Sequence, residues 1–146
     1  MKWVTRKHIR TNRVATPWLI RRFVDNDAEF IFTEPNEVAS VQHSQGAIGF
    51  DAPGARYNHD SGITSFEQIL EEHTITDPVL TDLAHIVHAA DIAGAIDKAP
   101  EAAGLRAISH GFPLVTKDDY ETLERAFFVY DSLYAYLKAR QNGQLK

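Results

Sequence analysis

Hydrophobic residues near the N-terminus of this 146-residue chain are grouped in two short segments with the composition of strands. Residues 3–7 and 29–33 are rich in the β-branched and aromatic residues that favour extended structure. Between them, Thr16 followed by proline is typical of a helix N-cap and first helical residue, so a helix is expected over residues 17–24. A strand–helix–strand unit is therefore predicted at the start of the chain.

Residues 44–63 carry closely spaced glycines and a proline, which predicts an irregular region, and the pattern beyond them is helical. Thr64 and Glu67 have the spacing of a capping box. The helices expected here cover approximately residues 65–72, 78–92, 100–109 and 117–140. Apolar and aromatic residues recur at alternating spacings of three and four in the last of these helices. The predicted fold is a helix-rich α+β domain over residues 1–146, with a small sheet formed early in the chain.

Composition excludes several classes of chemistry. The chain has no cysteine, so disulfides, thiolate metal sites and thiol nucleophiles are absent, and a cytoplasmic location is the expectation. No apolar run approaches the roughly 18 residues of a membrane span, so no membrane partner is expected. The net charge of −5 argues against nucleic-acid binding by this chain alone.

Basic residues are concentrated in the first 24 positions, where no Asp or Glu occurs before Asp25. This segment either docks against the acidic remainder of the protein or forms a site for an anion. Guanidinium groups bind tetrahedral oxyanions through paired hydrogen bonds, although the same arginines could instead bind the protein's own carboxylates. The candidate anion-binding residues are Arg10, Arg13, Arg21 and Arg22.

The predicted helix over residues 78–92 places a carboxylate on an apolar stripe. Asp91 lies about 40° from Val87 on this stripe, and His88 lies at its edge, at 100° per residue. A carboxylate facing a core must be paired, capped or coordinated. Asp91 and His88 could converge on a metal ion, or Asp91 could accept backbone N–H groups or pair with an arginine of the basic segment.

Two further residues complete a candidate metal site. His59 lies in a polar loop and Glu67 at the third position of a predicted helix, so each also has an ordinary surface or capping role. Together with His88 and Asp91 they form a His and carboxylate ligand set that suits Zn²⁺, Mn²⁺, Fe²⁺ or Ni²⁺ without distinguishing among them.

The segment from Arg10 to Phe23, with the sequence RTNRVATPWLIRRF, resembles the RxxRxACPWLIRRF signature of the C-terminal domain of the ChrB chromate-resistance family. The similarity continues through the His59 loop, the predicted capping box, His85 to Asp91, and the C-terminal helix. One departure is Thr16, where the family often has cysteine, so a cysteine-dependent mechanism is not expected. Longer members carry a preceding region associated with regulation, and a DNA-binding role of that region is not transferred to this chain.

The resemblance implies a link to chromate resistance or sensing, with a small oxyanion such as chromate as partner. On this interpretation the chain is a metal- and oxyanion-binding domain. The alternative is a small metal-dependent enzyme acting on an anionic substrate, in which the metal would activate water or polarise the substrate. Both functions use the same residues, so the sequence does not separate them.

Overall fold

The computed structural model describes residues 1–145 and, for His59, the backbone alone. The strands are β1 (Lys2–Arg6), β2 (Glu29–Thr33) and β3 (Ile48–Gly49). The α-helices are α1 (Asn12–Leu19), α2 (Val38–Gln45), α3 (Ser65–Glu72), α4 (Pro78–Asp91), α5 (Ala102–Val115) and α6 (Asp119–Gln141). A π-helical turn η1 (Ile20–Val24) extends α1, and the 3₁₀ turns are η2 (Pro35–Glu37), η3 (His59–Ser61) and η4 (Ile96–Lys98).

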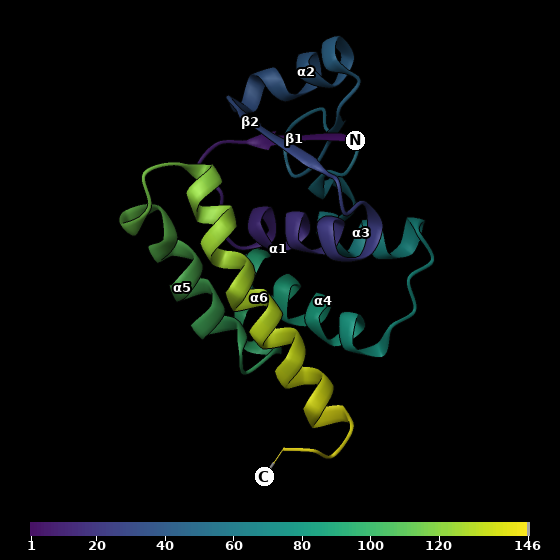
Figure 1. Ribbon diagram of the computed structural model, residues 1–146, viewed down its shortest axis with the longest axis vertical. Coiled ribbons are helices and arrows are strands. Elements are labelled where there is room, and N and C mark those ends of the chain that lie inside the picture. The colour runs from purple at the N-terminus through teal and green to yellow at the C-terminus, as the bar shows by residue number, and fades with distance from the viewer. Residues whose placement is uncertain (146) are drawn as a thin grey trace.

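The sheet has the order β2-β1-β3, and both strand pairs are parallel. Strand β1 is central, with Trp3 opposite Phe30 on one side and Ile48 on the other. Parallel neighbours require crossover connections. The chain crosses from β1 to β2 through α1 and returns to β3 through α2, and Figure 1 shows these two helices on opposite faces of the sheet.

Helix α1 is the centre of the molecule. It lies between the sheet and the helical layer, where it contacts α3, α4 and α6, and all eight of its residues are buried (Figure 1). The main core gathers around Trp3, Trp18, Phe66 and Tyr130, while a smaller core under α2 includes Val4 and Val38. Across residues 1–145, no helix combines the length and hydrophobicity needed to cross a membrane.

The predicted helix-rich α+β fold with an early sheet is confirmed, but the predicted start of the first helix is wrong. Helix α1 begins at Asn12, and Pro17 lies inside it. Its first turn is held by a buried network that the sequence pattern does not reveal. Asn12 Nδ2 donates to Ser65 Oγ at 2.7 Å, and Thr16 Oγ1 donates to Asn12 Oδ1 at 2.9 Å. This network ties the start of α1 to the start of α3.

Other boundaries also differ from the prediction. Helix α2 lies where no helix was expected, and α5 continues past Gly111 to Val115 with Pro113 inside it. The helix expected over residues 117–140 would have Thr116 as its N-cap, but Thr116 does not cap α6. Asp118 does, since its side chain accepts the backbone N–H of Glu121 at 2.8 Å. The predicted capping box at the start of α3 is confirmed.

Candidate functional site

In this fold a ligand site is expected at the carboxyl ends of the parallel strands. In parallel sheets, ligands bind beyond the carboxyl ends of the strands, where successive connections leave in opposite directions. Strand β1 satisfies this condition. The chain leaves β1 towards β2 on one side of the sheet, and β3 is added on the other side of β1. Arg6 ends β1, and Asp51 follows shortly after β3. Both residues line a cavity at this edge.

This cavity has a volume of about 350 Å³ and is called the arginine cavity below. It lies between the loop after β1, the end of α4 and one face of α5. Four arginines from these segments line it: Arg6, Arg10, Arg13 and Arg106. Asp51, Asp91 and His110 also line it. With four guanidinium groups against two carboxylates, the lining carries a formal charge of +2 when His110 is neutral.

Arg13 is the most buried cation of the arginine cavity, with 9% of its surface exposed. Its Nη2 donates to the carbonyl of His8 at 3.1 Å, and its Nη1 lies 3.6 Å from Asp51 Oδ2. Its buried Nε has no hydrogen-bond partner among the described residues. Burial lowers the pKa of Arg13 and the charge of Asp51 opposes this effect, so the guanidinium stays charged. An excess of guanidinium groups on a cavity wall is a site for an acceptor such as an oxyanion.

The backbone around the cavity is held in unusual conformations. Thr11 has φ 51° and ψ −116°, and Asp51 has φ 49°. A positive φ is unfavourable for a β-branched residue, and such strain is concentrated at functional sites. The strained Thr11 is fixed by its carbonyl, which accepts the hydroxyl of the buried Tyr130 at 3.2 Å. Asp51 is fixed by its own carbonyl, which accepts Arg6 Nε at 2.9 Å.

Asp91 contacts the basic segment. The sequence leaves two roles open for this carboxylate, a metal ligand or a partner of backbone N–H groups and arginines. Asp91 ends α4, and its Oδ1 accepts the backbone N–H of Asn12 at 3.4 Å, at the N-terminus of α1. A carboxylate is favoured there by the helix dipole. The charge of Asp91 also acts on Arg13 and helps to keep that guanidinium protonated. Asp91 is therefore part of the wall of the arginine cavity.

Glu67 and His88 form a second pair, on a neighbouring cavity of about 510 Å³. His88 Nδ1 lies 2.7 Å from Glu67 Oε1, which also accepts the Thr64 backbone N–H at 2.8 Å. A carboxylate accepts hydrogen bonds, so Nδ1 of His88 is the donor in this pair, and in the neutral imidazole the lone pair is then on Nε2. A histidine held in this way by a carboxylate is the usual arrangement of a metal ligand.

The four proposed metal ligands are thus found in different settings. Glu67 and His88 are in contact, Asp91 lines the arginine cavity, and the side chain of His59 lies outside the described residues. Among the side chains that the structure describes, no group of three or more His, Asp or Glu residues could hold a metal ion.

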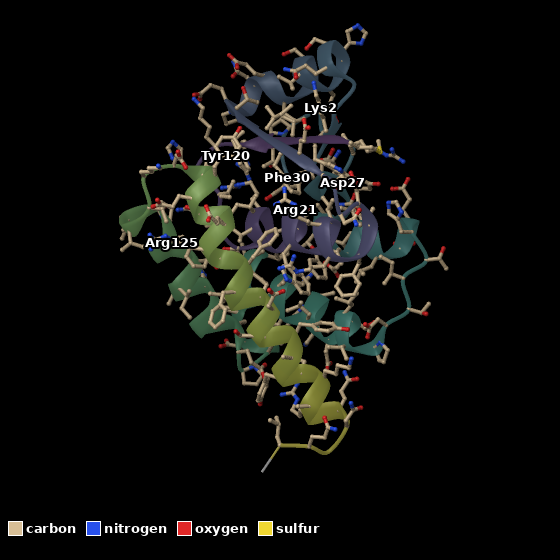
Figure 2. The ribbon with its side chains drawn as sticks, viewed as in Figure 1. Lys2, Arg21, Asp27, Phe30, Tyr120 and Arg125 are labelled. Atoms are coloured by element: carbon tan, nitrogen blue, oxygen red, sulfur yellow. The ribbon has the colours of Figure 1, made fainter. Side chains whose placement is uncertain are left out.

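The four proposed anion-binding arginines separate into two pairs. Arg10 and Arg13 line the arginine cavity, whereas Arg21 and Arg22 line a different one of about 610 Å³. Arg22 forms two hydrogen bonds with Asp131, at 3.1 and 2.9 Å. Arg21 donates to the carbonyl of Ala28 at 2.7 Å. Its guanidinium lies 4.9 Å from the centre of the Phe30 ring, and Figure 2 shows the two side chains together beneath β2.

Sequence reasoning did not select four charged or titratable residues of the arginine cavity, namely Arg6, Asp51, Arg106 and His110. Arg106 and His110 are four positions apart on α5, so they lie on one helix face, and this spacing was a usable signal. Asp51 has no comparable signal, because its place beside Arg6 and Arg13 depends on the pairing of β1 with β3.

The fold and this cavity define an α+β domain with a positively charged site at the end of a parallel sheet. The family model for the ChrB C-terminal domain matches residues 3–137, so the chain belongs to that family. It is 34% identical to Protein ChrB of Cupriavidus metallidurans over 139 residues, and this aligned region covers 94% of the chain. The chain spans about two-fifths of the length of that relative, at 41%. No solved structure matches.

The buried pairing of Arg13 with Asp51 makes a direct prediction about stability. Replacing Asp51 by Asn leaves the buried guanidinium without its compensating charge, so we expect a loss of about 3 kcal/mol in the free energy of unfolding. Glu34→Gln is the matched control, since the ion pair of Lys7 and Glu34 is exposed and its loss should have a much smaller effect. Urea unfolding measures both; equal effects would show that the Arg13–Asp51 pair contributes no more than a surface pair.

Proposed function

We propose that this protein is an oxyanion-binding domain whose site is the arginine cavity. The observation that carries the proposal is the wall of this cavity, where four guanidinium groups stand against two carboxylates. Arg6 and Arg13 are fixed by hydrogen bonds to backbone carbonyls, so part of the site is preorganised. Arg10 and Arg106 are exposed and can adjust to the anion.

A tetrahedral oxyanion suits this arrangement. Each guanidinium presents N–H groups in a fixed fork, and hydrogen bonds between charged partners are short and strong. The formal charge of +2 matches a dianion. The link of the ChrB family to chromate resistance, which the sequence resemblance implied, makes chromate the expected ligand and resistance or sensing the expected role. Sulfate has the same shape and charge and serves as an inert probe.

Sulfate binding tests this proposal. We expect Arg10→Ala and Arg106→Ala each to weaken sulfate binding about tenfold or more, as the loss of a hydrogen bond to a charged group does. Both side chains are exposed, so the fold should persist. Arg22→Ala is the control, because Arg22 is paired with Asp131 on another cavity. Calorimetric titration decides: a loss confined to Arg22→Ala would move the site to the second cavity and overturn the assignment.

The pH dependence of sulfate affinity gives a second test through His110. Partial desolvation and the positive charges of Arg10 and Arg106 lower the pKa of His110, so the free site holds it neutral near pH 7. A bound dianion offsets these charges and raises the pKa, which means that binding takes up a proton. Affinity should therefore rise as pH falls from about 8 to about 5.5.

His110→Gln should remove this slope while leaving sulfate affinity near pH 8 unchanged. Sulfate is the appropriate probe because it stays a dianion over this range, whereas chromate itself takes up a proton. A slope that persists in His110→Gln would assign the titration to another group.

We propose a metal ion as a second ligand of the domain, held by Nε2 of His88. The contact of Nδ1 with Glu67 supports this role, because it orients the ring and raises its basicity. In this arrangement Glu67 positions His88, and His59 remains the proposed further ligand, whereas Asp91 lines a different cavity. A bound divalent ion would supply a Lewis acid or an activated water, which is the basis for the second candidate function, a small metal-dependent enzyme acting on an anionic substrate.

Elemental analysis of the dialysed protein tests the metal proposal. We expect near-stoichiometric Zn, Mn, Fe or Ni in the natural protein, a loss of about tenfold or more in metal affinity in His88→Ala, and a smaller loss in Glu67→Gln. His43→Ala is the control, since His43 is exposed on α2. A folded protein without metal, or equal metal content in His88→Ala and His43→Ala, would return Glu67 and His88 to a purely structural role.

A further inference from the structure

The arginine cavity is larger than an inorganic oxyanion requires. Its volume is about 350 Å³, whereas a tetrahedral ion of five heavy atoms fills roughly the space of two or three waters at about 30 Å³ each. Cavities of this size are typical of sites for organic ligands. More than half of the space therefore remains for a group attached to the anion.

The walls of this remaining space differ from the arginine wall. The C-terminal end of α4 and the turn after it contribute the small or apolar side chains of Ala90, Ile92 and Ala93. Asp51 and Asp91 add two carboxylates. A bare dianion gains nothing from the apolar wall and is repelled by the carboxylates. A carboxylate has about four acceptor positions, so the half-buried Asp91 can receive a hydroxyl group in addition to the contacts that it already makes, whereas Asp51 is buried against two of the arginines.

The two walls together define the parts of one ligand. The arginines and the excess positive charge fit a terminal phosphate dianion, which offers three oxygens to several guanidinium forks. A planar carboxylate would fill one fork, and a sulfate monoester carries one charge fewer. The carboxylate of Asp91 fits a hydroxyl donor, and the alanines and Ile92 leave room for a short carbon chain against α4.

We propose that the arginine cavity binds the phosphate monoester of a small hydroxylated compound, such as a polyol phosphate. The phosphate lies on the four arginines, a hydroxyl group donates to Asp91, and the carbon skeleton packs on Ala90, Ile92 and Ala93. The inference rests on the proposed function, because the phosphate uses the same arginines as an inorganic oxyanion.

Three probes separate the parts of this proposal: inorganic phosphate, ethyl phosphate and glycerol 3-phosphate. We expect glycerol 3-phosphate to bind about tenfold more tightly than either of the others, because a hydroxyl group forms a hydrogen bond to a charged acceptor. Asp91→Asn, which keeps an acceptor for the Asn12 N–H, should reduce this preference without weakening the binding of inorganic phosphate.

A second variant tests the α4 wall. Ala93 is exposed in the turn after α4 and lines the arginine cavity, so Ala93→Leu places a larger side chain in the space assigned to the carbon skeleton. We expect this variant to lose glycerol 3-phosphate binding about tenfold and to keep that of inorganic phosphate. Equal affinities of the three probes, with binding still lost in Arg10→Ala, would overturn this inference and leave the oxyanion site intact. Absence of binding by all three probes and by sulfate would overturn both.

Discussion

The structure around the site depends on one buried guanidinium. Arg13 lies at the start of α1, below the carboxyl end of the parallel sheet, and a charge in this position requires compensation. Asp51 supplies it from the loop after β3, and the carbonyl of His8 supplies a hydrogen bond from the loop after β1. Together, the ion pair and this hydrogen bond join α1 to the loops after β1 and β3, which bound the cavity.

The rest of the fold keeps this guanidinium in place. The side chain of Asn12, next to Arg13, donates a hydrogen bond to Ser65 at the start of α3. The backbone N–H of Asn12 donates to Asp91 at the end of α4. Three elements that are distant in sequence thus meet at one helix terminus. Tyr130 of α6 adds a fourth, through the carbonyl of the strained Thr11. A site built from these contacts is rigid on the sheet side, while the exposed Arg10 and the face of α5 remain adjustable.

Much of the fold could be predicted because its signals are local. The strand over residues 29–33 and the capping box at Thr64 agree with the structure, since β-favouring composition and cap spacing depend on neighbouring residues. The start of α1 could not be predicted in this way. Its first turn, with Asn12 and Arg13, is stabilised by α3, α4 and the loop after β3, and the local signal of Thr16 and Pro17 gave way to these tertiary contacts.

The sequence by itself determined the kinds of group available: a basic N-terminal segment, no thiol, and a carboxylate at position 91 on an apolar stripe that had to find a partner. Tertiary structure alone decided which groups meet. Arg10 and Arg13 share a cavity, whereas Arg22 is paired with Asp131; His88 and Asp91, three residues apart on α4, line different cavities. The physical reason is that a helix turns about 300° over three residues, so the packing of α1, α3 and α5 around α4 determines what each face contacts.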